Sequence, residues 1–162
     1  MFKQGIQHDF KHNYIRLGTV DVQETIDAIK QHLDNHKNDK KISVEKRVSY
    51  KGQLVKLGTL RLKTFAKCGT TCSSCGLEAK YFAFERNSGH ESYHLNLWGQ
   101  LPSGKEVLFT HDHTLARGLG GVDSITNTTT MCQICNAEKS QMERVACEKM
   151  HDERNRQAVM EN

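Results

Sequence analysis

Two Cys-x-x-Cys pairs constrain the fold of this chain more than any other feature of its sequence. They are Cys72/Cys75 and Cys132/Cys135, and a long segment separates them. A turn of this kind presents two thiolates to one ion, and zinc prefers four such ligands in a tetrahedron. We therefore expect one structural Zn²⁺ site that joins the two pairs, with two redox pairs or buried thiols as the alternative.

The composition favours metal ligation over disulfide bonds for these cysteines. The 162 residues include six Cys and nine His, and the formal net charge is +4. The start of the chain lacks the apolar core of a signal peptide, and no stretch approaches the roughly 18 apolar residues of a membrane helix. We expect a soluble, cytoplasmic protein with no membrane partner, in which cysteines stay reduced. The positive charge suits a polyanion partner and, equally, simple solubility.

The first part of the chain, residues 1–58, is expected to form a small helical and β-stranded accessory module. Its elements are predicted, in order, as a helix over 21–36, a charged loop over 38–41 and two short strands over 42–57. Apolar residues spaced three and four apart indicate the helix, and Asp21 is its expected cap. The two strands are expected to meet at a turn formed by Lys51 and Gly52.

Residues 59–150 are expected to carry the zinc-bound domain, followed by a charged tail over 151–162. Thr59 is predicted to cap its first helix. The later elements are predicted as a helix over 60–67, strands over 81–84, 93–98 and 107–110, a glycine-rich loop over 117–121 and a last helix from about residue 132. The third strand delivers residues 111–113 at its end. Cys68 and Cys147 lie outside the two cysteine pairs, and we expect them to be free or buried thiols.

The residues around this strand end suit phosphodiester hydrolysis, which needs an activated water and a cation. Asp112 and Asn136 offer the oxygen ligands that a hard cation such as Mg²⁺ prefers. His113 has a pKa range suited to taking a proton from water. Asn127 can lock the intervening loop or orient the imidazole. Because Cys135 precedes Asn136, zinc at the cysteines would fix the catalytic cation site as well.

Three further residues are candidates for contact with nucleic acid. Arg117 and Lys139 are expected to contact phosphate, with an ordinary surface charge as the alternative for each. His111 is an additional imidazole that could contact phosphate or metal, and the alternative is a solvated residue at the strand end. Asp123 is predicted to be a turn residue rather than a metal ligand.

Together these motifs resemble the HNH endonucleases of the ββα-metal, or His-Me finger, type. The resemblance covers about residues 68–140 and is carried by Asp112-His113, Gly120-Gly121, Asn127 and Cys132-x-x-Cys135-Asn136-x-x-Lys139. It is closest to the variant that ends in Asn and carries two CxxC knuckles, which is common in phage-encoded nucleases and homing enzymes. One departure is Ala116, which stands where the family commonly has Pro after the Asp-His pair.

The resemblance implies an α+β fold, with a ββα-metal HNH nuclease core stapled by a zinc site of four cysteines. It implies Asp112 and Asn136 as ligands of a catalytic Mg²⁺ or Mn²⁺ and His113 as the general base. Asn127 would be the residue that positions His113.

The expected function is therefore a metal-dependent endonuclease that hydrolyses phosphodiester bonds in DNA, by nicking or by double-strand cutting. Branched DNA and RNA remain open as substrates, and the protein could be a monomer or a homodimer, in the host cytoplasm if it is phage-encoded. The alternative is a non-catalytic zinc-ribbon module that binds nucleic acid. Such a module would keep the four cysteines but would not need Asp112, His113, Asn127 and Asn136 in register.

Overall fold

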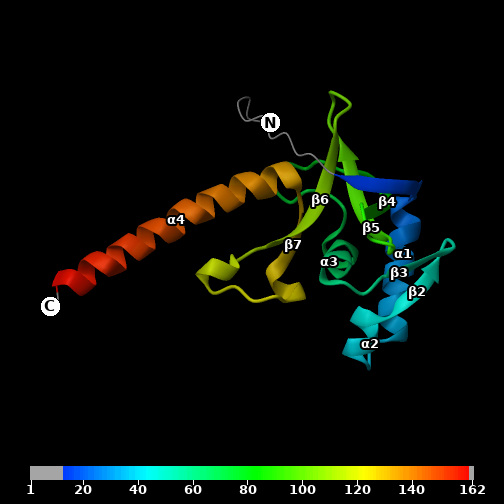
Figure 1. The fold of residues 1–162 in the computed structure, drawn as a ribbon, viewed down its shortest axis with the longest axis horizontal. Coiled ribbons are helices and arrows are strands. Elements are labelled where there is room, and N and C mark those ends of the chain that lie inside the picture. Colours follow the sequence, from blue (N-terminus) through cyan, green and yellow to red (C-terminus); the bar gives the residue numbers. More distant parts are fainter. Residues whose placement is uncertain (1–12, 161–162) are drawn as a thin grey trace.

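The structure is a computed structural model that describes residues 13–160 and shows a mixed α+β fold (Figure 1). Its centre is a five-stranded antiparallel sheet in the order β1-β4-β5-β6-β7. The strands of this sheet are β1 (Tyr14–Val20), β4 (Ala79–Asn87), β5 (His94–Gln100), β6 (Glu106–His113) and β7 (Thr128–Cys132). The three strands expected from the sequence are confirmed, and each is longer than expected.

A separate two-stranded hairpin and several helices flank this sheet. The hairpin consists of β2 (Arg47–Tyr50) and β3 (Gln53–Lys56). The helices of the described residues are α1 (Val22–Asn35), α2 (Lys40–Glu45), α3 (Leu60–Cys68) and α4 (Gln133–Met160), with single 3₁₀ turns at Arg117–Leu119 and Ile125–Asn127. None of the helices between residues 13 and 160 combines the length and the apolar character of a membrane span.

Local side-chain chemistry sets where α1 and α3 begin. Asp21 accepts a hydrogen bond from the backbone N–H of Glu24 (2.9 Å), and Thr59 accepts one from that of Leu62 (3.4 Å). Each bond satisfies an N–H group that has no partner inside its own helix. Both predicted helices and both predicted caps are confirmed.

The β2–β3 hairpin forms at the turn that the sequence predicts. Lys51 and Gly52 have φ values of 51° and 79°. Two successive left-handed residues make a turn whose twist matches that of the flanking strands. The predicted start of the first strand at residue 42 is wrong, however, because that residue lies in α2 and β2 begins at Arg47.

The short helix α2 depends on a contact that the sequence does not reveal. The buried His32 of α1 donates a hydrogen bond from Nε2 to the carbonyl oxygen of Ser43 (2.8 Å). Gly58 packs against the same carbonyl group, where a Cβ atom would lie only 1.7 Å from the oxygen. Because so short a helix is unstable by itself, its packing against α1 and Gly58 holds it in place.

One face of the sheet packs against α1 and α3 and forms the main core. Alternate residues of β4, β5 and β6 point to this face, as strand geometry requires. The largest contributors are Ile26, Ile29, Leu62, Phe65, Phe82, Phe84, Leu95, Leu97, Val107 and Phe109. Since β1 pairs with β4 and α1 packs on α3, the sheet and core draw on both sides of residue 58. The accessory role expected for residues 1–58 stays a prediction.

The last helix leaves the body of the protein. In Figure 1, α4 starts beside β6 and β7 and then extends away from every other element. It runs to Met160, so the charged residues expected as a tail from position 151 continue the helix. Residues 1–12 and 161–162, which belong to the expected module and tail, lie outside the described residues.

Replacing Gly58 by alanine should destabilise the fold by about 1–3 kcal/mol, the usual cost of forcing an extra methyl group into a packed site. The new Cβ would collide with the Ser43 carbonyl group and push α2 away from α1. Gly18→Ala is the matched control, because no atom lies within 4 Å of a Cβ built there. Urea unfolding followed by circular dichroism measures both changes, and equal stability of the two variants would contradict this account of α2.

Candidate functional site

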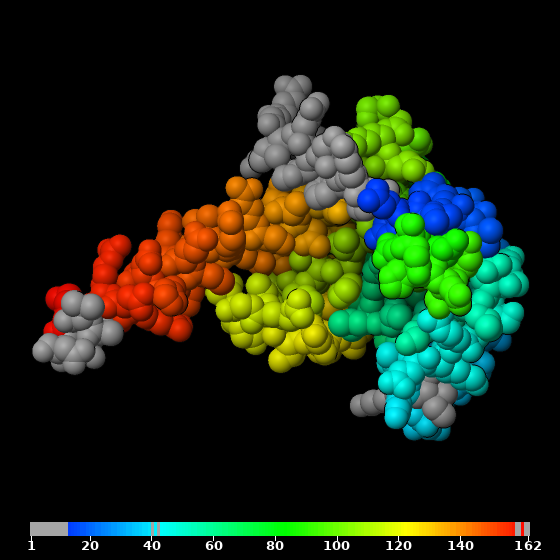
Figure 2. All heavy atoms as spheres, in the orientation of Figure 1, coloured from blue at the N-terminus to red at the C-terminus, as the bar shows by residue number. Residues whose placement is uncertain are grey.

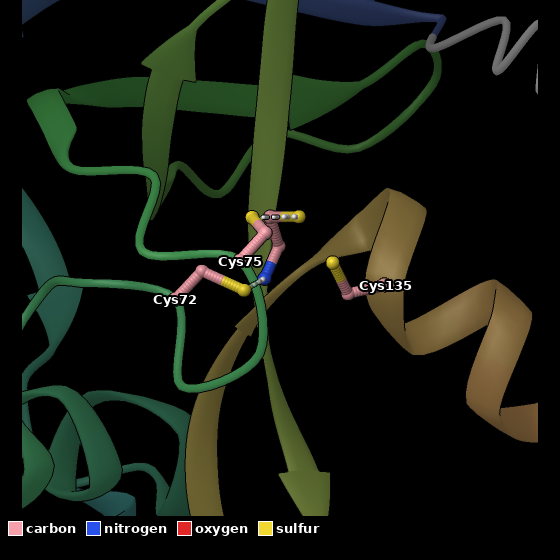
Figure 3. Close-up of side chains that lie close together, drawn as sticks. Cys72, Cys75 and Cys135 are labelled. Atoms are coloured by element: carbon pink, nitrogen blue, oxygen red, sulfur yellow. Dashed lines mark hydrogen bonds between the residues drawn. The ribbon is translucent and has the colours of Figure 1, made fainter. Parts of the chain in front are cut away.

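The two CxxC pairs converge on one point. The sulfur atoms of Cys72, Cys75, Cys132 and Cys135 all lie within 4.8 Å of one another. The sulfur atoms of Cys75 and Cys132 are 3.9 Å apart, close to the edge of about 3.8 Å that follows from a Zn–S bond of about 2.3 Å in a tetrahedron. The sulfur atoms of the labelled side chains face a shared space between a loop and the start of α4 (Figure 3). These four cysteines can hold a metal ion such as Zn²⁺.

Backbone hydrogen bonds shape the first pair into a tight knuckle. The N–H of Gly76 donates to the carbonyl oxygen of Cys72 (3.0 Å), and the N–H of Cys72 donates to that of Leu77 (2.8 Å). Gly76 has a φ of 75°, a left-handed conformation that glycine adopts without strain. The N–H of Ser73 donates to the carbonyl oxygen of Thr130 (2.9 Å), so the knuckle is also fastened to β7.

The second pair links β7 to α4. Cys132 is the last residue of β7, and Cys135 lies in the first turn of α4. The backbone N–H of Cys132 donates to the sulfur of Cys72 (3.3 Å), a contact that favours the thiolate form of Cys72. A shared ion would therefore fix the direction in which α4 leaves the sheet. Cys68 and Cys147 lie outside this cluster and are free thiols, as expected.

Burial and neighbouring sulfur atoms shift the ionisation of Cys72, Cys132 and Cys135. A side-chain hydrogen bond from the Cys132 thiol lowers the pKa of the Cys72 thiol to about 4. The same bond, together with burial, raises the pKa of Cys132, and burial raises that of Cys135 to about 11. One thiolate thus forms at the expense of its neighbours. A divalent cation among the sulfurs would remove this competition, because it stabilises every ligand in its deprotonated form.

Asn136 contacts β6 through Thr110, two residues before Asp112, where the strand packs against α4. The side-chain N–H₂ of Asn136 donates to the hydroxyl oxygen of Thr110 (2.8 Å), and its Oδ1 accepts from Ser140 (3.3 Å). Thr110 and Asp112 are two residues apart on one strand, so their side chains share a face. Asp112 is nearly buried, at 7% exposure. The structure therefore directs the two expected oxygen ligands to one face of β6.

Lys139 occupies this face too, but as a partner of Asp112. Its ammonium group forms an ion pair with the Asp112 carboxylate, donates to the carbonyl oxygen of His113, and lies 3.2 Å from Glu143. Burial alone would lower the pKa of Lys139, but the hydrogen bonds to Asp112 and Glu143 outweigh it and raise that pKa. The phosphate contact expected for Lys139 stays a prediction, and in this structure the residue neutralises Asp112.

His113 points to the opposite face of β6, as the alternation of a strand requires. Its Nε2 atom lies 2.6 Å from Oδ1 of Asp123, and no described residue hydrogen-bonds to its Nδ1. The ring of His111 lies on the same face, with its centroid 5.8 Å from that of His113. Burial and then the charge of Arg61 lower the pKa of His111. Asp112 and His113 can thus act together only at the end of the strand, where both faces are within reach.

Asp123 is a residue of the candidate site that the sequence does not reveal. The sequence predicts only a turn residue at this position, yet Asp123 holds the imidazole of His113 and also lies 3.8 Å from Nη1 of Arg117. Arg117 itself is 70% exposed. The contact with His113 forms because the loop after β6 folds back on itself. The spacing of Asp123 and His113 along the chain does not predict this contact, because it depends on how the loop folds.

Asn127 closes that loop. Its Oδ1 accepts from the backbone N–H of Leu115 (2.9 Å), and its Nδ2 donates to the carbonyl oxygens of Leu115 and Val122 (both 3.0 Å). Gly121 lies so close to Leu115 that a Cβ atom would come within 1.8 Å of its carbonyl oxygen. Of the two roles considered for Asn127, the contacts are those of a loop lock. These hydrogen bonds hold the segment that contains Ala116 in place. The family that the chain resembles commonly has proline at that position.

The structure thus gathers the expected site residues into two groups around one strand end. Asp112, Asn136 and Lys139 lie between β6 and α4, and His111 and His113 lie on the other face. Comparisons of the chain with models of known families, with curated proteins and with solved structures give no match. The residues and their geometry therefore carry the functional interpretation.

Replacing Cys75 by serine should abolish the binding of one Zn²⁺ per chain and destabilise the fold, because three thiolates bind this ion far less tightly than four. Cys68→Ser is the matched control, since Cys68 lies outside the cluster. Elemental analysis of the purified variants measures the metal, and thermal melting with and without a chelator measures the coupling. Full zinc content in the Cys75 variant would exclude a four-cysteine site.

Replacing Asn127 by alanine should free the loop over residues 114–127. Leaving backbone groups of Leu115 and Val122 without partners costs roughly 1–3 kcal/mol each where they are shielded from water. Hydrogen exchange of the Leu115 amide, which donates to Asn127 Oδ1, should accelerate by at least about tenfold. Asn155→Ala, an exposed change on α4, serves as the control. Unchanged exchange at Leu115 would show that other contacts close the loop.

Proposed function

We propose that this chain is a metal-dependent endonuclease of the HNH type that hydrolyses phosphodiester bonds in DNA. The observation that carries the proposal is the unit β6–loop–β7–α4. In it, Asp112 and His113 end one strand, and Asn136 lies in the first turn of the helix that packs on that strand. The four clustered cysteines fasten the start of that helix. A module that served only as a zinc-stapled fold would not need these side chains together.

The oxygen donors between β6 and α4 fit a hard divalent cation. Asp112 supplies a carboxylate and Asn136 an amide oxygen that accepts one hydrogen bond, from Ser140. Mg²⁺ and Mn²⁺ prefer such oxygen ligands and bind through few protein groups, with water and substrate phosphate completing the shell. When bound there, either ion supplies positive charge that stabilises the phosphorane-like transition state and the leaving oxygen.

His113 is the proposed general base. Its Nε2 is engaged with Asp123, which fixes the orientation and the tautomer of the ring. Nδ1 is then the nitrogen that takes a proton from the attacking water. The water oxygen forms a bond to phosphorus as the bond to the 3′ oxygen breaks, and the departing oxygen is protonated from solvent. The products are a 5′-phosphate and a 3′-hydroxyl.

The other groups support this reaction without touching the reacting atoms. Asn127 holds the loop that brings Asp123 to His113. Arg117 and His111 lie on the His113 side, where a phosphate would approach. Lys139 must share Asp112 with the incoming cation, so its ammonium group would turn toward a phosphate or toward Glu143. One such centre cuts one strand, so double-strand cutting would need a homodimer or two events. Branched DNA and RNA are further substrates for the same chemistry.

The second candidate function is a zinc-stabilised module that binds nucleic acid without cutting it. The ion pair between Lys139 and Asp112 favours it. The ammonium group already neutralises the carboxylate, so no metal ion is needed there. A purely structural residue requires no more than this.

A plasmid-cleavage assay separates the two candidates. The zinc-loaded protein should nick or linearise DNA with Mg²⁺ or Mn²⁺ and stop when the ion is chelated. His113→Ala should lower the rate by at least about a hundredfold, because loss of a general base commonly costs that much. His151→Ala on the exposed end of α4 should cut normally.

Zinc content and circular dichroism must be equal in the two variants for this comparison to hold. Normal cutting by His113→Ala would overturn the assignment of the base. Failure of every form to cut plasmid, branched DNA or RNA would leave the binding module as the function.

A further inference from the structure

A small basic pocket lies at the junction of the β2–β3 hairpin with α3 and β5. It has a volume of about 140 Å³, and Arg47, Lys56, Arg61 and His94 contribute to its lining. Among the described residues, no carboxylate lines it. In Figure 2 the hairpin (cyan) lies beside the segment that leads into β5 (bright green) on one face of the molecule. The pocket thus combines residues that are distant in sequence and share one sign of charge.

The hairpin sets two of these cations against each other. Arg47 and Lys56 are directly opposed partners in the register of β2 and β3. Like charges in such a pair destabilise a hairpin, and no described carboxylate forms an ion pair with either residue. Arg47 donates one long, exposed hydrogen bond to the carbonyl oxygen of Leu54 (3.4 Å), but the opposition of the two charges does not itself favour folding. A bound anion between the two side chains would offset the repulsion.

Arg61 adds a third positive charge from the first turn of α3. Its Nη2 donates to the carbonyl oxygen of Leu95 (3.0 Å), and it forms no ion pair with a described carboxylate. Burial lowers the pKa of its guanidinium group, and attraction by Tyr14 and Glu85 offsets this only in part. An arginine held by one neutral carbonyl group keeps most of its five N–H donors for another ligand.

Arg61 also connects the pocket to the strand of the proposed site. After burial, its charge is the next largest cause that lowers the pKa values of His94 and His111. Arg61 therefore lies within electrostatic range of both rings, and His111 shares its face of β6 with His113.

The size and charge of the pocket indicate its ligand. Pockets that hold drug-sized molecules usually have volumes of roughly 300 Å³ or more, so this one suits a compact anion rather than a whole nucleotide. Arginine forks match the oxygens of a phosphate group. A concave surface with one sign of charge also concentrates field and attracts polyanions.

We propose that this pocket binds a backbone phosphate of the nucleic acid, at a position along the strand away from the bond that is cut. The proposal rests on the proposed function only for the identity of the bound strand. The pocket supplies affinity and register and takes no part in the chemistry. Arg47, Lys56 and Arg61 contact the phosphate oxygens, and His94 borders the site.

The test measures DNA binding without cleavage, by fluorescence anisotropy of a labelled duplex of about 30 base pairs with the zinc-loaded chain. Divalent ions other than the bound zinc are left out, so that the result does not depend on catalysis. Arg47→Gln/Lys56→Gln should bind about tenfold more weakly at about 100 mM salt. The slope of log K against log salt should fall in magnitude by about 1, as expected when one phosphate contact is lost. Lys80→Gln/Lys149→Gln removes the same charge from sites outside the pocket and should have little effect.

The melting temperature distinguishes a binding role of these residues from a structural one, because loss of a structural contact would lower it. The double change removes a like-charge pair and loses only the long, exposed bond from Arg47 to the Leu54 carbonyl oxygen. Arg47→Gln/Lys56→Gln should therefore melt at the same temperature as the parent chain or higher. Arg61→Gln also loses its bond to Leu95, so a lower melting temperature there would not count against the pocket. Weaker DNA binding with unchanged or raised stability in the double variant would support the proposal.

The remaining outcomes separate this proposal from the nuclease itself. Equal affinity and salt slope in the pocket variants and the lysine control would overturn the proposal, as would a parent chain that binds no DNA. Binding of inorganic phosphate that depends on the pocket, with DNA binding unaffected, would also overturn it in favour of a small-anion site. Loss of DNA binding in the pocket variants, with no cutting by any form, would uphold the pocket and overturn the nuclease.

Discussion

The convergence of four cysteine sulfurs is the constraint on which the rest of the site depends. It ties the loop after α3 to the junction of β7 and α4, which are distant in the sequence. Cys135 lies one residue before Asn136, so whatever fixes the sulfurs also fixes the first turn of α4 against β6. Beyond that turn, α4 soon extends away from the sheet, and the exposed remainder of the helix does little to hold it against the rest of the protein. A cross-link of this kind stabilises a small polar chain where apolar burial is limited.

Strand β6 divides the site into two sides with different electrostatics. On the α4 side, Asp112 is nearly buried and neutralised by Lys139, which creates a compact oxygen-rich contact. On the α3 side, His111 lies within electrostatic range of Arg61, and His113 is oriented by Asp123. Strand geometry imposes this separation, because neighbouring side chains point to opposite faces. A phosphate that meets both sides must therefore sit at the end of β6, where the loop locked by Asn127 begins.

Much of the fold follows from local patterns in the sequence. Asp21 and Thr59 cap helices because their side-chain oxygens reach N–H groups three residues on. Lys51-Gly52 makes the hairpin turn because it accepts positive φ angles. The failures have a common cause. Helix α2 stands in place of an expected strand because His32 and Gly58 hold it from outside. The role of Asp123 escapes sequence reasoning because it depends on how a loop closes.

The sequence by itself determined which residues are able to bind metal, which begin helices and which turn the chain. These properties depend on residue type and on spacings of a few positions. Both are fixed in the covalent chain before it folds. The meeting of the two CxxC pairs, which the sequence predicts, is confirmed. The tertiary structure alone decided that Lys139 pairs with Asp112. It likewise decided that Asp123 orients His113, and that Arg47, Lys56 and Arg61 surround one pocket. Such contacts join residues far apart along the chain, and only the packing of whole elements on one another brings them together.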